Sequence, residues 1–204
     1  MVGRLLSLID REIRGLHEAA YVLAAFTLLS QLLALFRDRT FAHLFGAGPT
    51  LDVYFAAFRI PDLVFALLTL FVSSFALVPL ISSKTREEQG RVIGSTLALF
   101  GIIAVVVSTI LYFLIPYLVP TIVPGFTPAQ VHDTETLVYI LLFQPLLLGL
   151  SSIAASVVQA SRQFMLFALA PILYNVGIII GAVTLYPSLG IEGLAWGVVL
   201  GALL

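Results

Sequence analysis

The chain has 204 residues, of which 60% are hydrophobic and 10% are charged, and its formal net charge is −1. A soluble domain carries roughly 25% charged residues, so this chain has too little charge to cover a surface that faces water. The nearly balanced charge argues against nucleic acid as a partner. Because the chain has no cysteine, thiol catalysis, disulfides and cysteine-zinc sites are excluded. Composition therefore indicates a protein whose outer surface faces lipid.

Six apolar segments have the length, or nearly the length, of a membrane span, which is about 20 residues. They are residues 19–36, continuing with more polar residues to 45, then 63–81, 92–115, 136–160, 164–186 and 191–204. A helix over the last segment would be roughly 21 Å long, shorter than the ~30 Å hydrocarbon core. We therefore expect an all-α, polytopic transmembrane bundle of six helices, the sixth truncated, and interpret the chain as a fragment or a truncated gene product.

The N-terminal segment precedes the first span. Apolar residues recur at helical spacing from Leu5 to Leu16, among charged residues. This pattern predicts an amphipathic helix in the membrane interface over residues 1–17, followed by a transmembrane lobe over 18–204. A solvated leader is the alternative interpretation.

Basic residues predict the orientation, because cytoplasmic loops carry an excess of Lys and Arg. They precede the first span, separate the second from the third and follow the fourth, whereas residues 116–133 and 186–192 contain none. The first turn, near Arg37 and Arg39, is the exception. We expect the N-terminus to lie in the cytoplasm.

Prolines interrupt several apolar segments. Pro145 and Pro171 each predict a kink within a span, because proline lacks the amide proton that a helix requires. The prolines that recur every fourth residue from Pro116 to Pro128 predict a loop rather than a helix.

Glycines recur every fourth residue in the last two spans, at 177 and 181 and at 193, 197 and 201. This spacing lets two helices approach closely. We expect packing within one bundle rather than dimerisation.

Arg37 and Asp38 end the first apolar run. A charged residue at mid-membrane costs ~2.5–3.5 kcal/mol to insert, so it persists where it lines a cavity or has a partner. Adjacent helical residues point in different directions, so we expect each of the two to find its partner elsewhere and not in the other.

Asp52 and Arg59 are seven residues apart and would share one face of an unbroken second helix. A helix from Asp52 to residue 82 would be about 46 Å long, so we expect Pro61 to break or bend it, as in transporters that line a cavity with irregular backbone. The alternative is an ion cluster at headgroup level, with Arg59 and Asp62 as a local pair.

Other polar residues suggest packing rather than chemistry. Asn175 and Gln144 are expected to be hydrogen-bond partners between helices. No nucleophile with a base, metal triad or phosphate loop occurs in the sequence, so we expect no enzyme and no cofactor, and the sequence leaves open whether an ion is coupled to transport.

Two stretches carry a family pattern. The first reads SQLLALFRD from Ser30, FGAG from Phe45, DVYFAAFRIPDL from Asp52 and FALVP from Phe75; the second runs from RQF at Arg162 to APILYN, which ends at Asn175. In register over most of the chain, this pattern resembles the MurJ (MviN) family of lipid II flippases.

The resemblance implies a fold of the multidrug/oligosaccharidyl-lipid/polysaccharide exporter type, in which two six-helix lobes face each other. This chain would be the N-terminal lobe, with a C-terminal lobe as its missing partner. The family's cationic cavity receives the pyrophosphate of an undecaprenyl-linked glycan in the bacterial cytoplasmic membrane. Arg37 carries over as a pyrophosphate ligand, Asp38 and Asp52 as structural or gating partners, and Arg59 as a basic position near the kink.

The sequence also departs from the family pattern. Gln31 stands where an arginine is usual, Phe65 and Ala66 replace a basic pair, and Leu70-Phe71 replaces an acidic residue followed by glycine. Three functions are therefore kept: lipid II flipping by alternating access, export of another undecaprenyl-linked glycan or a drug, and a transport-inactive scaffold of the cell-wall machinery.

Overall fold

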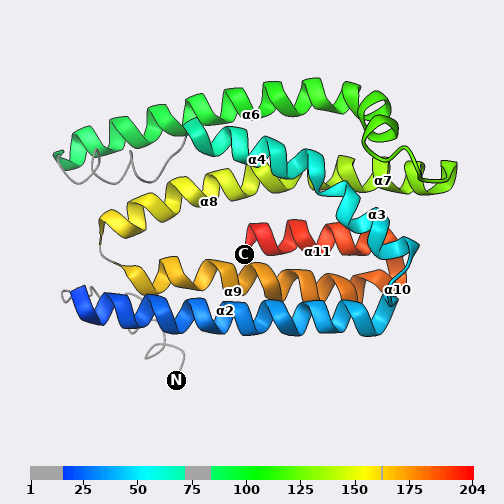
Figure 1. Cartoon of the computed structure of the whole chain (residues 1–204). Helices are drawn as coiled ribbons and strands as arrows, with labels where there is room; N and C mark the ends of the chain where they lie inside the picture. The colour runs from blue at the N-terminus through cyan, green and yellow to red at the C-terminus, as the bar shows by residue number, and fades with distance from the viewer. Residues whose placement is uncertain (1–15, 72–83, 162) are drawn as a thin grey trace.

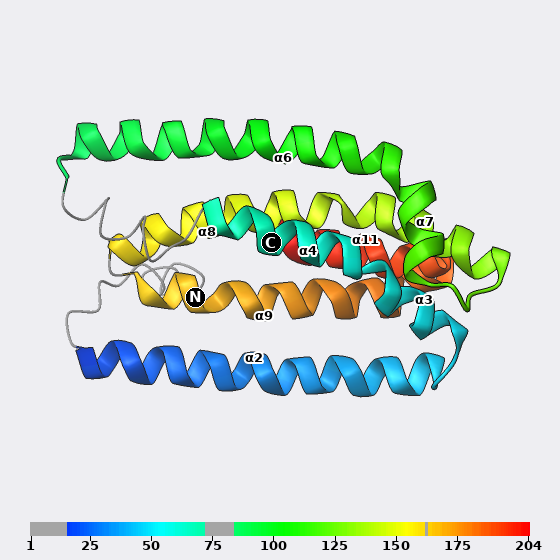
Figure 2. The same cartoon turned by 45° about the horizontal axis from the view of Figure 1, so that its top comes forward.

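The computed structural model describes residues 16–71, 84–161 and 163–204, and within these ranges every regular element is a helix. Four helical stretches are long and apolar enough to cross a membrane: 20–45, 86–122, 128–160 and 164–189. They run side by side along one axis (Figures 1 and 2). The predicted all-α membrane bundle is confirmed. Residues 1–15 of the predicted interfacial segment and Arg162 lie outside the described residues.

The first pass is α2 (Leu16–Phe45), which already includes the last two residues assigned to the interfacial segment. It ends at Gly46, whose φ of 63° suits a residue without a Cβ. The second pass is divided into α3 (Pro49–Ala57) and α4 (Arg59–Phe71). The break lies at Phe58, three residues before Pro61, so the predicted break is confirmed. The expected continuation of this pass to residue 81 lies outside the described residues.

The third pass, α6 (Arg86–Ile122), is longer than predicted. It includes Pro116 and Pro120, so the prediction of a loop from residue 116 was wrong. The reason is packing: Ile115 and Val119 are buried on one side of the helix, and the two prolines are exposed on the other. The loop is confined to residues 123–127.

The fourth pass consists of α7 (Pro128–Leu141) and α8 (Phe143–Ala160). They are separated at Leu142, three residues before Pro145, which confirms the predicted kink. The broken passes are neighbours, because α3 packs on α7 and α4 packs on α8.

The fifth pass is α9 (Phe164–Ile180), which continues as a π-helix (Gly181–Leu185) and α10 (Tyr186–Leu189). Pro171 lies inside α9, where the helix is unbroken, and the π-helical turn was not predicted. The last element is α11 (Ile191–Leu203).

Glycine contacts join the fifth pass to α11. A Cβ added to Gly177 would collide with the backbone of Gly201, and one added to Gly181 would collide with Gly197. We call this contact the glycine seam. Its helices belong to one chain, as predicted.

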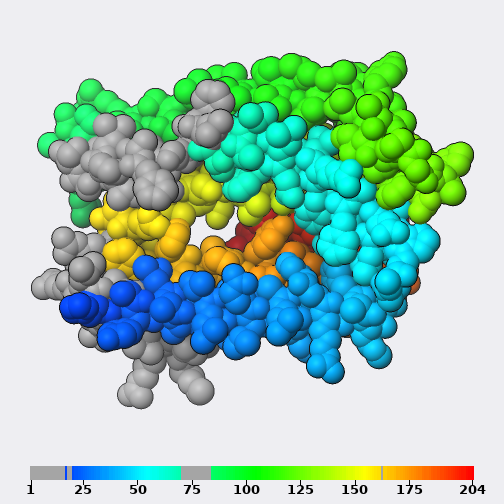
Figure 3. All heavy atoms as spheres, viewed as in Figure 1, coloured from blue at the N-terminus to red at the C-terminus, as the bar shows by residue number. Residues whose placement is uncertain are grey.

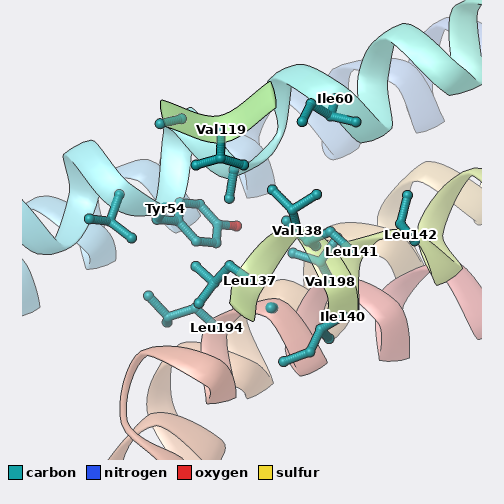
Figure 4. Close-up of a cluster of buried hydrophobic side chains, with 14 of the residues drawn as sticks. Tyr54, Ile60, Val119, Leu137, Val138, Ile140, Leu141, Leu142, Leu194 and Val198 are labelled. Atoms are coloured by element: carbon teal, nitrogen blue, oxygen red, sulfur yellow. The ribbon is translucent and has the colours of Figure 1, made fainter. Parts of the chain in front are cut away.

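The largest hydrophobic core lies where α3, α6, α7 and α11 meet (Figure 4). Tyr54, Val119, Leu137 and Leu194 are each at most 3% exposed there. By contrast, α2 and α6 present large apolar side chains outward, including Leu35, Phe36, Ile102, Phe113 and Tyr117. A polar exterior is not needed here, since lipid solvates the outer faces of a membrane bundle.

The start of α2, the start of α6 and the junction of α8 with α9 lie at one end of the bundle (Figure 1). These are the ends that adjoin the basic segments. The arrangement agrees with basic segments on a shared side, and the side of the membrane on which they lie stays a prediction.

Candidate functional site

A hollow opens between α2 and α4, with α9 and α11 visible at its base (Figure 3). It exists because α2 packs along α9, while α4 packs on α8 and α6. Polar side chains from α2, α3, α4, α8 and α9 form a cluster among the helices around this hollow.

Arg37 is the cation of the cluster. Its Nε and Nη2 donate to Oδ1 of Asp38 at 2.9 and 2.8 Å, and its Nη1 donates to Oδ1 of Asn175 at 2.9 Å. The expectation that Arg37 and Asp38 do not pair was therefore wrong, because the long arginine side chain folds back towards its neighbour. The expectation of a partner elsewhere was correct for Arg37. Its side chain is 25% exposed, so the guanidinium is partly accessible.

Asn175 joins α9 to α2. Its Nδ2 donates to the carbonyl of Pro171 at 2.9 Å and to Oγ of Ser30 at 3.5 Å, and its Oδ1 accepts from Arg37. Asn175 is 6% exposed and Ser30 is 8% exposed, so these bonds form away from solvent. The predicted helix-to-helix role of Asn175 is confirmed, and the residue also holds the arginine.

Asp62, Gln144 and Tyr174 form the other part of the cluster. Nε2 of Gln144 donates to the Tyr174 hydroxyl at 3.2 Å, which links α8 to α9 as predicted for Gln144. The Asp62 carboxylate also interacts with the Gln144 side chain. Tyr174 lies within electrostatic range of both Asp62 and Arg37, so the two parts are one cluster.

Asp52 and Arg59 lie outside this cluster. The break at Phe58 places Asp52 on α3 and Arg59 on α4, so they do not belong to one unbroken helix. Both are exposed, and Nη1 of Arg59 donates to the carbonyl of Ile122 at 3.1 Å. A cation there stabilises the C-terminal end of α6, where carbonyls lack partners within the helix. Within the described residues, Arg59 and Asp62 form no salt bridge.

Sequence reasoning assigned no site role to Tyr174 or Tyr54. Tyr54 is 3% exposed and lies within electrostatic range of Arg37, Asp38 and Asp62. One signal was available: Tyr174 and Asn175 are adjacent polar residues in an otherwise apolar span. In the part of the chain that the structure describes, no group of three His, Cys, Asp or Glu residues could hold a metal ion.

Comparison with known proteins gives a consistent result. A family model described as lipid II flippase MurJ matches residues 41–204. The lipid II flippase MurJ of Burkholderia cenocepacia is 29% identical over an alignment of length 204. That alignment covers 93% of this chain and 38% of that protein. That of Thermosipho africanus is 31% identical over 182 residues, covering 87% of this chain and 37% of that protein.

A solved structure of lipid II flippase MurJ in an inward closed conformation has the same fold. The TM-score is 0.74 at 29% identity, covering 90% of this chain and 40% of that one. The chain thus spans about two fifths of the length of these relatives and corresponds to their N-terminal lobe. Since the family match takes in most of the sequence and the solved member repeats its helical arrangement, the chain belongs to the lipid II flippase MurJ family.

Proposed function

We propose that the complete protein to which this chain belongs flips lipid II across the bacterial cytoplasmic membrane by alternating access, with the N-terminus in the cytoplasm. The observation that carries this proposal is Arg37, a partly accessible arginine held among the helices around the hollow. A guanidinium presents several donors in a plane and binds phosphate oxygens with two parallel hydrogen bonds.

In this proposal Arg37 binds the pyrophosphate of the undecaprenyl-linked precursor, and Asp38 and Asn175 orient the guanidinium. Asp52 is a candidate gating residue away from the cluster, and Arg59 is a basic position near the break at Phe58. The C-terminal lobe supplies the opposite wall of the cavity. The protein acts as a transporter and not as an enzyme.

A second candidate is export of another undecaprenyl-linked glycan. The observation that favours it is that three positions, Gln31, Phe65 and Ala66, have neutral side chains and therefore supply no second cation. Gln31 and Ala66 are exposed, and Phe65 is half-buried. A glycan linked through a single phosphate, which carries less negative charge than a pyrophosphate, would need fewer cationic contacts.

The test is complementation of a MurJ-depleted bacterium with the full-length gene. Wild type should restore growth. Arg37→Ala should fail although it inserts at normal levels, because the phosphate ligand is lost. Arg91→Ala is the matched control, since Arg91 is 77% exposed and its partner Glu87 lies on the same helix. Normal growth on Arg37→Ala as the sole flippase would refute the assignment, and a well-inserted wild type that gives no rescue would favour the second candidate.

A further inference from the structure

The charges of the cluster do not balance. Three nitrogens of Arg37 are engaged, two with Asp38 and one with Asn175, so Asp38 already neutralises this cation. Asp62 adds a second carboxylate. With Arg37 at +1 and Asp38 and Asp62 at −1 each, the cluster carries one net negative charge.

Asp62 has polar neighbours on α3, α8 and α9, but within the described residues it has no cation of its own. The Gln144 side chain of α8 interacts with its carboxylate, and Tyr174 of α9 and Tyr54 of α3 lie within electrostatic range. Among the residues that the structure describes, Asp62 forms no salt bridge. Asp62 is exposed, so a small ion can reach it.

Gln144, whose side chain contacts this carboxylate, also offers an unused acceptor. Its side chain is 3% exposed, and its Oε1 has no hydrogen-bond partner although it is buried. A buried acceptor without a donor is costly. The carboxylate, this amide oxygen and the Tyr174 hydroxyl are all oxygen ligands, the type that hard cations prefer.

We propose that Asp62, Gln144 and Tyr174 form a site for a monovalent cation, a proton or Na⁺, whose occupation allows an anionic headgroup to bind at Arg37. An empty site leaves the cluster negative, so it repels a pyrophosphate at low dielectric. An occupied site makes the cluster neutral and removes the repulsion. The inference rests on the proposed function, because it assumes a phosphate-bearing substrate.

The coupling must be reciprocal. If the cation raises the affinity for the anion, then the anion raises the affinity for the cation by the same factor. Cation and substrate would therefore be bound together and released together. A gradient of the cation across the membrane would then drive the flipping of the substrate.

The test measures the binding of inorganic pyrophosphate to the full-length protein in lipid nanodiscs, over a series of pH values and Na⁺ concentrations. The comparison is between wild type and Asp62→Asn, which is permanently neutral. Because both proteins are measured at each pH, protonation of the pyrophosphate itself cancels. Asp133→Asn is the matched control, since it makes the same chemical change in α7 outside the cluster.

For a proton site, the affinity of wild type relative to Asp62→Asn should rise about tenfold for each pH unit lowered, until the two coincide. For a Na⁺ site, it should rise with Na⁺ at constant pH, with choline as the inert substitute. Asp133→Asn should follow wild type, and Asp62→Glu, which keeps the charge, should retain the dependence. Equal pH and Na⁺ dependence in wild type and Asp62→Asn would overturn the proposal.

A second measurement separates this inference from the proposed function. Without phosphate, wild type should bind Na⁺ or take up a proton, and Asp62→Asn should not. In the proton case, the uptake should occur at a higher pH than that at which an ordinary aspartate titrates. If this difference is found while pyrophosphate binds to neither protein, the cation site stands and the anion-binding function fails. If neither cation distinguishes the two proteins, the cation site is refuted, whatever the phosphate result.

Discussion

The glycine seam and the hollow are built from the same kind of apolar helix, and α9 takes part in both. In the seam, the backbones of the two helices touch at the glycines, and a Cβ added there would meet backbone atoms. Around the hollow, α2 and α4 stand apart, and the cluster on the surrounding helices contains an arginine, two carboxylates and an acceptor without a donor. The difference lies in the side chains. Glycine permits backbone contact in the seam, whereas beside the hollow Arg37 and Asn175 join α2 to α9 through a side-chain hydrogen bond.

The seam and the cluster are stabilised by different interactions. In lipid there is little hydrophobic drive between helices, so close van der Waals packing stabilises the seam. The cluster gains less, because burying charge offsets much of what pairing contributes. The seam should therefore determine stability, and the cluster should determine what the lobe binds.

The largest effect is expected in the seam. Gly197→Ala places a Cβ against the backbone of Gly181, which cannot move aside as a side chain would. The variant should lose about 3 kcal/mol or more of stability, at the upper end of the cost of overpacking. Thermal unfolding of the purified protein in detergent measures this loss. The matched control is Gly94→Ala in α6, where no atom lies within 4 Å of the added Cβ and alanine should be neutral or slightly stabilising. Similar unfolding temperatures for both variants would contradict the close contact.

A middle-sized effect is expected where the two regions meet. Asn175→Leu keeps a side chain of similar size in α9 but leaves Arg37 without one acceptor and Ser30 without a partner. Because a bond to a charged group is lost, stability should fall by about 1–3 kcal/mol. The same thermal assay measures the fall, and transport should drop with it. Full stability with lost transport would mean that Asn175 acts in substrate binding and does not stabilise the fold.

The smallest effect is expected far from both regions. Thr85 begins α6 with a capping box, in which its Oγ1 accepts from the Glu88 amide while the Glu88 carboxylate accepts from the Thr85 amide. Thr85→Ala should cost about 1 kcal/mol and leave transport unchanged. Thr85→Ser is the matched control and should restore the bond. A loss of transport in Thr85→Ala at normal stability would show that effects at the ends of the bundle reach the hollow.

Most of the fold could be predicted from the sequence, because a lipid-facing helix must be apolar along its length and glycine spacing is visible in one dimension. The seam is the clearest example: the positions of Gly177 and Gly181 and those of Gly197 and Gly201 predicted the contact that the structure contains. Such local patterns determine which surfaces can meet.

The prolines could not be interpreted in the same way. Pro61 and Pro145 are buried, and each lies three residues after a helix break. Pro116, Pro120 and Pro171 are exposed and lie within continuous helices. All five lack the same amide proton, so the sequence alone does not distinguish them. The distinction depends on what each ring packs against, which is a property of the tertiary structure.

The site was only partly predictable for a related reason. Arg37 was recognised from its position at the end of an apolar run, but its pairing with Asp38 depends on the reach of a long, flexible side chain. Tyr174 and Gln144 are 30 residues apart on consecutive helices, and only the packing of α8 against α9 brings them together.

The two broken passes have a mechanical consequence. Because α3 packs on α7 and α4 packs on α8, the breaks at Phe58 and Leu142 are adjacent rather than staggered. If the breaks were staggered, each would lie beside an unbroken stretch of the neighbouring helix, which would restrict bending at the break. With adjacent breaks, bending at both points moves α4 and α8 as a pair relative to α3 and α7 and shifts the contacts of α8 with α6, α9 and α11. Asp62 and Gln144 would then move together.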